Sequence, residues 1–228
     1  MEFNKAIQYI ATALEYPTTE TPSAIQAAKE ALQDQDVDVI PANAGIQKSL
    51  DSLGQFLDST SLEQSQEAYT RLFDLQPACT PHLGYHLFGD TYIRGALLAE
   101  LVAEYRQRDL SLGHELPDYV PHVLRLWASL PAEDRTLLQT YLLAPGFNRL
   151  CFAARNIDSP WIQVLQALAA LWPAEEEVLK TLSNSRAQTT AAEHAKPEVV
   201  LWKAGIQENR DLQTCLDPRL CGCREGSV

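Results

Sequence analysis

The chain has 228 residues, of which 46% are hydrophobic, so it can bury one sizeable core in a single domain. It has no run of about 18 consecutive apolar residues, which argues against a transmembrane helix and predicts no direct membrane insertion. Its N-terminus, MEFNKAIQYI, lacks the basic and apolar regions of an export signal. We therefore expect a cytoplasmic protein.

The formal net charge of −12 is concentrated in the first half of the chain. Residues 1–118 contain 18 acidic and 7 basic side chains, whereas residues 119–228 contain 12 and 11. An acidic surface repels phosphate backbones and attracts basic peptides. This distribution argues against nucleic-acid binding and is compatible with a basic partner, although acidity that only maintains solubility is the alternative.

Apolar residues recur at helical spacing along most of the chain, and strand-like alternation is nowhere sustained. Helices are predicted at residues 3–16, 23–32, 50–57, 61–73, 90–108, 119–130, 132–143, 147–155, 160–171 and 173–182. Ser61 and Gln64 have the spacing of a capping box at the start of one of them. The pattern predicts an all-α fold, a single bundle of roughly eight to ten helices.

Proline and glycine divide this pattern and suggest the domain boundaries. Residues 1–182 are predicted to form one helical domain, with a loop insertion at about 34–48 and a second break at 74–89. Residues 183–228 lose the helical periodicity and are predicted to be a flexible tail.

The tetrapeptide Ala-Gly-Ile-Gln occurs twice, at residues 44–47 and 204–207. The surrounding phrases VIPANAGIQ and AGIQENRDLQTCLDPRLCG resemble translated copies of dispersed bacterial repeat elements. We therefore predict that both are late insertions that carry no function.

No catalytic or metal-binding motif is recognisable. The chain has no phosphate-binding loop, dinucleotide-binding glycine fingerprint, H-E-x-x-H motif or nucleophile elbow. His82 and His86 could share a metal only on a helix, which Pro81 and Gly84 make unexpected. The five cysteines (Cys79, Cys151, Cys215, Cys221 and Cys223) form neither a disulfide framework nor paired C-x-x-C motifs. We expect no catalytic residue and no metal site.

The most informative stretch runs from Tyr69 to Pro131. Its landmarks are Tyr69, Leu72 and Phe73; Gly89-Asp90 and Arg94-Gly95; Tyr105; and Glu115-Leu116-Pro117-Asp118, then Tyr119 and Pro121. This compound motif closely resembles the nitrate reductase delta-subunit branch of the TorD/DmsD family of molybdoenzyme assembly chaperones. The resemblance extends over about residues 3–175. One position departs from it, because Tyr119 stands where the family usually has histidine.

The motif residues have an expected structural role. Pro117 restricts the backbone before it, and Asp118 is placed to cap a helix that begins at Tyr119. Asp90 is expected to cap the preceding long helix, in which Gly95 permits close packing. Arg94 could pair with Asp90, Glu115 or Asp118. The apolar stripe that contains Trp127 makes this tryptophan a core residue rather than a contact.

The resemblance implies a chaperone that binds the N-terminal, twin-arginine-type segment of an apo catalytic subunit, in nitrate reductase or a close relative. Such a chaperone assists insertion of the molybdenum cofactor and binds no cofactor stably itself. A basic amphipathic peptide would place its apolar face in a groove and its arginines against carboxylates. The candidate contacts are Tyr85, His86, Leu87, Tyr92, Glu115, Asp118, Tyr119 and His122, with Glu115 and Asp118 as acidic anchors.

Two other classes of function remain open. The chain could be a helical adaptor for an unrelated basic peptide or protein, or an enzyme that uses His86 and the acidic Glu115–Asp118 segment. The enzyme alternative is the weaker one, because the sequence contains no recognisable nucleophile–base arrangement. The sequence does not distinguish a monomer from a dimer.

Overall fold

The computed structural model describes residues 2–33, 41–75, 79–180 and 182. Every regular element in these residues is a helix, so the all-α prediction is confirmed. The elements are α1 (Glu2–Ala13), α2 (Thr21–Gln33), α3 (Pro41–Ser59), α4 (Leu62–Phe73), α5 (Leu83–Phe88), α6 (Tyr92–Gln107), α7 (Val120–Ser129), α8 (Ala132–Leu138), a π-helical turn η2 (Gln139–Leu143), α9 (Ala144–Ala153) and α10 (Pro160–Leu171). Residues 176–180 are also helical.

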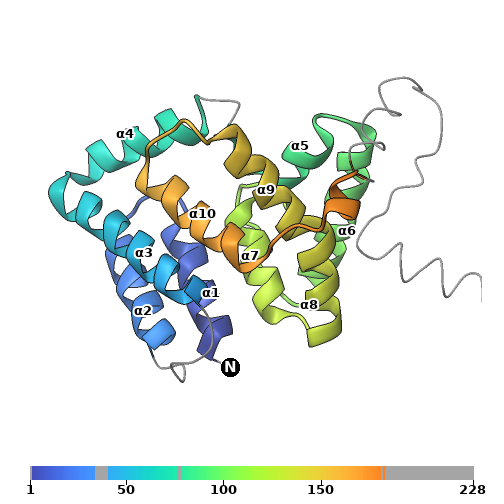
Figure 1. Cartoon of the computed structure of the whole chain (residues 1–228), viewed down its shortest axis with the longest axis horizontal. Coiled ribbons are helices and arrows are strands. Elements are labelled where there is room, and N and C mark those ends of the chain that lie inside the picture. Colours follow the sequence, from blue (N-terminus) through green and yellow to red (C-terminus); the bar gives the residue numbers. More distant parts are fainter. Residues whose placement is uncertain (1, 34–40, 76–78, 181, 183–228) are drawn as a thin grey trace, which may run out of the picture.

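The helices form two neighbouring groups that share one hydrophobic core (Figure 1). Helices α1–α4 lie together with α10, which packs on α3, while α5–α9 lie on the other side. Helix α7 joins the groups because it packs against α1 and α8. Nearly all of α7 is buried, as expected for a helix whose whole circumference contacts protein.

Trp127 on α7 lies in this core, as the sequence predicts. Its indole ring contacts the rings of Phe3 and Trp172 edge-on or tilted, at centroid distances of 6.1 and 5.0 Å. The guanidinium of Arg135 lies over the ring, 4.9 Å from its centroid. Trp127 therefore holds α1, α7 and the segment after α10 together.

The loop predicted at residues 34–48 is wrong over residues 41–48, which form the start of α3. Proline suits the first helical position because its fixed φ matches the helix and the missing N–H has no partner to lose. Ile46, Leu50 and Leu53 follow at helical spacing and are fully buried. The first Ala-Gly-Ile-Gln copy thus contributes to the core, whereas residues 34–40 and the second copy lie outside the described residues.

The break predicted at residues 74–89 contains the short helix α5, although Pro81 and Gly84 made a helix unexpected there. Both expected carboxylate caps are wrong. Thr91 occupies the N-cap position of α6 and Tyr119 that of α7, and neither makes a side-chain capping bond. The capping box at Ser61 and Gln64 is confirmed, with bonds of 3.3 and 3.0 Å.

The expectation for Gly95 is wrong, and that for the C-terminal tail stays a prediction. Gly95 does not permit a close contact, since a Cβ placed there would meet nothing within 4 Å. The proposed tail at 183–228, with Cys215, Cys221 and Cys223, lies outside the described residues. Cys79 is buried and Cys151 half-buried, and both are free thiols.

Candidate functional site

Two segments far apart in the sequence are joined by an isolated antiparallel bridge between His82 and Tyr119. The N–H of Leu83 donates to the carbonyl of Asp118 at 2.9 Å, and the N–H of Val120 donates to the carbonyl of Pro81 at 2.8 Å. These bonds bring the start of α5 against the start of α7. The Pro81–Gly89 region and the Glu-Leu-Pro-Asp motif are therefore parts of one site, which we call the hinge.

The hinge contains a buried ion pair. Asp118 is fully buried and accepts hydrogen bonds from Arg94 Nε at 2.9 Å and Nη2 at 3.3 Å. Of the three partners considered for Arg94, Asp118 is the one observed. A Cβ at Gly84 would lie 2.7 Å from Asp118 Oδ2 and 2.9 Å from Leu97 Cδ2. Glycine is therefore required there, because any side chain would push into the pair.

The two hinge histidines face Thr80. Thr80 Oγ1 lies 2.9 Å from His82 Nδ1, and His86 Nε2 donates to the Thr80 carbonyl at 2.8 Å. Burial lowers the pKa of both imidazoles, and for His82 the Asp118 carboxylate partly offsets this. Within the described residues, no group of three metal-ligating side chains occurs. Through these hydrogen bonds the two histidines hold Thr80 against the start of α5.

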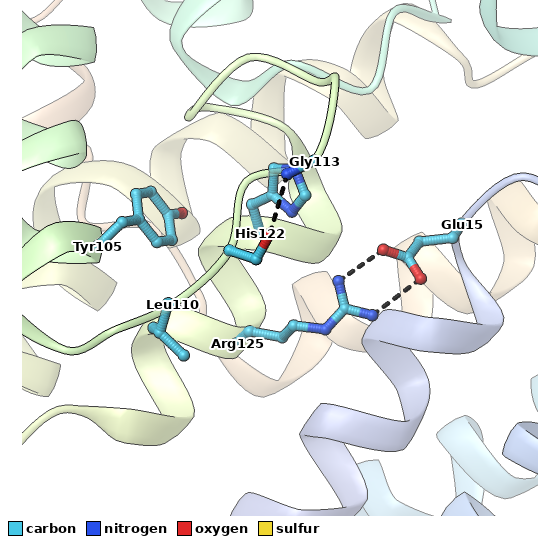
Figure 2. A pocket seen from close by; sticks show the side chains of 7 residues that line it. Glu15, Tyr105, Leu110, Gly113, His122 and Arg125 are labelled. Carbon is cyan, nitrogen blue, oxygen red and sulfur yellow. Dashed lines mark hydrogen bonds and ion pairs between the residues drawn. The ribbon is translucent and has the colours of Figure 1, made fainter.

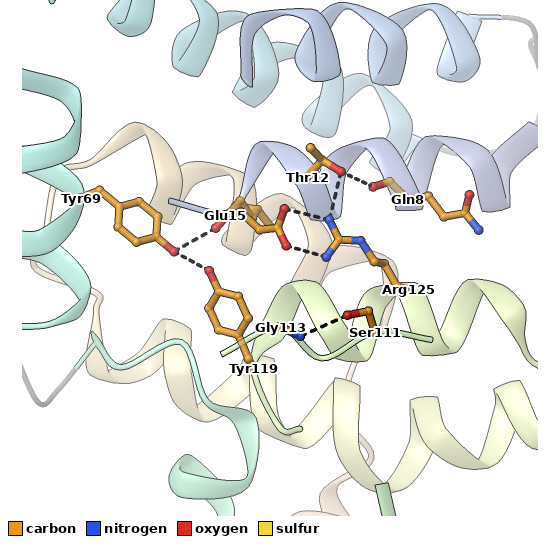
Figure 3. Close-up of polar contacts among 9 residues, drawn as sticks. Gln8, Thr12, Glu15, Tyr69, Ser111, Gly113, Tyr119 and Arg125 are labelled. Carbon is orange, nitrogen blue, oxygen red and sulfur yellow. Dashed lines mark hydrogen bonds and ion pairs between the residues drawn. The ribbon is translucent and has the colours of Figure 1, made fainter. Parts of the chain in front are cut away.

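Tyr119, which replaces the usual histidine, belongs to a chain of hydrogen bonds (Figure 3). Its hydroxyl lies 2.7 Å from that of Tyr69, which donates to the carbonyl of Leu14 at 3.0 Å. Since Tyr69 has only one hydroxyl hydrogen, Tyr119 must be the donor in their shared bond. Burial raises the pKa of both phenols, which keeps them protonated. The tyrosine pair ties α7 and α4 to the end of α1.

A second arginine–carboxylate pair joins α7 to α1. Arg125 donates to both oxygens of Glu15, at 2.6 and 2.9 Å, and to Thr12 Oγ1 at 3.1 Å (Figure 3). The pair borders a cavity of about 330 Å³ (Figure 2). The cavity is lined by Glu15, Tyr105, Leu110, Ser111, Gly113, His122 and Arg125.

The predicted peptide contacts differ in accessibility. Tyr92 is 78% exposed and the Glu115 side chain 54% exposed, while Tyr85 is half-buried beneath the guanidinium of Arg94, 5.5 Å from its ring centroid. The remaining five are buried: His86, Leu87, Asp118, Tyr119 and His122. Asp118 therefore cannot serve as an exposed acidic anchor. Leu116, a motif residue that is exposed, was not among the predicted contacts.

The other motif residues shape the backbone. Gly89 ends α5 with a φ of 67°, a conformation that L side chains rarely adopt. The carbonyl of Pro117 accepts a hydrogen bond from the hydroxyl of Tyr105 at 3.0 Å. Pro121 lies in the first turn of α7, where a proline costs no backbone bond. These contacts fix the direction in which the chain enters α7.

The arrangement of the helices is that of a known fold. It matches a redox enzyme maturation protein from Archaeoglobus fulgidus with a TM-score of 0.51, at 16% sequence identity, over 74% of this chain and 92% of that chain. The fold is thus that of the TorD-like maturation proteins. More particularly, the chain belongs to the nitrate reductase delta subunit family, whose sequence model matches residues 41–167. The resemblance seen in the sequence is confirmed.

Individual relatives align over shorter stretches. Over 87 residues the chain is 37% identical to the nitrate reductase molybdenum cofactor assembly chaperone NarJ of Escherichia coli K12, covering 36% of this chain and 37% of NarJ. Over 111 residues it is 29% identical to NarW of the same strain, described as the same kind of chaperone, covering 48% of each. The matched segments span less than half the length of these curated relatives. No described helix is long and apolar enough to cross a membrane.

Proposed function

We propose that this protein is an assembly chaperone for the catalytic subunit of a molybdoenzyme, nitrate reductase or a close relative. It holds the apo-subunit by its N-terminal segment in the cytoplasm and assists insertion of the molybdenum cofactor, without binding a cofactor stably or catalysing a reaction. Membership of the delta subunit family supports this proposal, as do relatives that are named molybdenum cofactor assembly chaperones.

The proposed binding surface consists of Tyr85, Tyr92, Glu115 and Leu116, and we call it the hinge surface. The observation that carries the proposal is the exposure of Tyr92, Leu116 and the Glu115 carboxylate around a buried hinge. Tyrosine is a frequent anchor in protein interfaces, and an exposed leucine beside it adds apolar surface. Glu115 provides the acidic group that a basic segment needs.

The buried part of the hinge would hold this surface in position. Arg94 connects α5 with the segment before α7, because its guanidinium lies over the ring of Tyr85 and binds the carboxylate of Asp118. A bound amphipathic segment would place its apolar side chains on Tyr92 and Leu116 and a basic side chain on Glu115. Binding would therefore combine burial of apolar surface with a salt-sensitive ion pair.

Calorimetric titration with synthetic N-terminal peptides of candidate clients tests this surface. We expect Tyr92→Ala to weaken binding by roughly fivefold or more, because a central aromatic anchor typically contributes over 1 kcal/mol. Glu115→Gln should weaken binding at low salt and reduce its salt dependence. Tyr9→Ala and Glu133→Gln, at exposed positions on α1 and α8, are the matched controls. Equal losses in both sets, or no heat with any peptide, would remove the hinge surface from consideration.

A second experiment separates this function from that of a general adaptor for basic partners. The chaperone should capture an apo catalytic subunit of a molybdoenzyme, and the capture should be lost when the N-terminus of that subunit is deleted. An adaptor for an unrelated partner would not show this dependence. Capture that persists after the deletion would point to a different binding region on the client.

A further inference from the structure

His82 has a buried ring nitrogen that the hydrogen bonds of the hinge leave unused. Its Nε2 atom is buried and makes no hydrogen bond within the described residues. The Oε2 atom of Glu115 lies 3.6 Å from this nitrogen, slightly beyond hydrogen-bonding distance. Glu115 is the acidic group of the hinge surface. An unpaired histidine nitrogen therefore lies next to the carboxylate that is proposed to meet the client.

The surroundings of the ring favour one tautomer of His82. Burial lowers the pKa of His82, so the ring is neutral near pH 7.5 and carries a single hydrogen. The hydroxyl of Thr80 lies 2.9 Å from Nδ1 and can donate to it, which places the hydrogen on Nε2. A bare Nε2 would instead turn its lone pair towards the carboxylate of Glu115. Both ends of the ring thus favour an N–H that faces Glu115.

The imidazole is held firmly, whereas the carboxylate is not. The ring of Tyr119 lies against the ring of His82 at a centroid distance of 5.7 Å, and the backbones of these two residues form the antiparallel bridge. The side chain of Glu115 is 54% exposed. An exposed glutamate samples several rotamers and loses that freedom when it binds a partner. A fixed N–H beside it restricts the rotamers before the partner arrives, which lowers the cost of binding.

We propose that His82 positions the Glu115 carboxylate for the client, with Nε2–H holding Oε2 so that Oε1 accepts the basic side chain. This inference rests on the function proposed above and adds a positioning residue behind the hinge surface. A neutral donor suits this role better than lysine or arginine would. A full positive charge beside the carboxylate would neutralise it and compete with the client.

A double-mutant cycle tests the coupling between the two residues, with a synthetic N-terminal peptide of a nitrate reductase catalytic subunit as the probe. His82→Phe retains a ring against Tyr119 but removes both nitrogens. At pH 7.5 and low salt it should weaken binding about threefold in the wild-type background and have no further effect in Glu115→Gln. His82→Gln, which retains an N–H near the position of Nε2, should restore most of the affinity. Equal losses for His82→Phe in both backgrounds would overturn the proposal, because they would mean that the ring only supports the fold.

The ring nitrogens give a second readout that needs no client. In the full chain labelled with ¹⁵N-histidine, NMR spectra should show a protonated Nε2 and a bare Nδ1 for His82. Glu115→Gln should shift the Nε2 resonance of His82 and leave the ring nitrogens of His86 unchanged. A bare Nε2, or no response to Glu115→Gln, would overturn the proposal.

The two readouts together separate this inference from the function on which it rests. If Glu115→Gln weakens peptide binding but His82→Phe does not, the hinge surface stands and the role of His82 is overturned. If neither variant changes binding although the NMR signature of His82 is present, the hinge surface itself fails, and the positioning role fails with it.

Discussion

Two of the arginine–carboxylate pairs in the described residues involve α7 or the residue pair just before it, and their surroundings differ. Arg94–Asp118 lies inside the hinge with its carboxylate fully buried, and Gly84 leaves just enough room for it. Arg125–Glu15 lies at the edge of a cavity, and both of its side chains retain partial exposure. Similar chemistry therefore occurs in two settings: the buried pair fixes the shape of the hinge, and the more open pair borders a cavity.

Removing one carboxylate from each pair should have the largest and most unequal effects. Asp118→Ala leaves Arg94 without its partner in a buried site, which typically costs about 3–5 kcal/mol of unfolding free energy. Glu15→Ala should cost less than about 1 kcal/mol, since water can solvate the freed Arg125. Chemical denaturation of both variants measures the difference. Similar losses would mean that burial does not distinguish the two pairs.

A glycine pair tests how tightly the buried pair is enclosed. Gly84→Ala should destabilise the protein by about 1–3 kcal/mol, because the new methyl group overlaps Asp118 and Leu97. Gly95→Ala, on the exposed side of α6, should instead stabilise it by about 0.5–1 kcal/mol, because alanine lowers the backbone entropy of the unfolded chain. In thermal unfolding, the midpoint temperature should therefore fall for Gly84→Ala and rise for Gly95→Ala. A neutral Gly84→Ala would show that the hinge relaxes easily.

The tyrosine pair lies between the two regions and should contribute less. Tyr119→Phe removes the donor to Tyr69 and should cost about 0.5–1.5 kcal/mol, the usual value for one hydrogen bond. Tyr92→Phe removes an exposed hydroxyl and should leave the unfolding free energy unchanged. Denaturant titration at neutral pH compares them. No loss for Tyr119→Phe would indicate that water or another group replaces the bond.

The smallest effect concerns acid stability. Burial lowers the pKa of His86 below its ordinary value of about 6.5, so the unfolded chain binds more protons than the folded one as the pH falls. The stabilisation is complete above about pH 6.5 and is lost as the pH decreases towards the folded pKa. His86→Leu should therefore flatten the decline of stability between about pH 7 and 5. The exposed His114→Leu is the control, and an unchanged slope in His86→Leu would contradict this origin.

The sequence predicted the helical class, the core role of Trp127 and the Ser61 capping box, because each depends on local spacing. It named Asp118 as one of three possible partners of Arg94, but it could not predict that the carboxylate of Asp118 is buried. Capping rules consider only neighbouring amides, whereas the observed partner, Arg94, lies 24 residues away and becomes available only through the hinge. For the same reason five of the predicted peptide contacts proved buried: a motif identifies which residues act together, not which of them face solvent.

At residues 41–48 the local sequence pattern was misleading, because loop-forming residues belong to a helix. Proline, asparagine and glycine suggested a loop, but Pro41 occupies the first helical position and Ile46 enters the core. Tertiary packing overrides weak helix propensity in such a case. The cavity was also beyond prediction, since its walls come from the segment after α1, from α6 and α7 and from residues 110–113, which no pattern along the chain relates.

The bridge between His82 and Tyr119 has a consequence for the order of events during synthesis. Its two backbone bonds close a long loop of chain, so they cannot form until Val120 has emerged from the ribosome. Helices α5 and α6 are made first, but Arg94 has no Asp118 until then. A nascent chain that ends before Asp118 would lack both the ion pair and the hydrogen bond between Tyr69 and Tyr119. On the function proposed here, the chaperone gains its client-binding surface only after more than half of its own sequence has been translated.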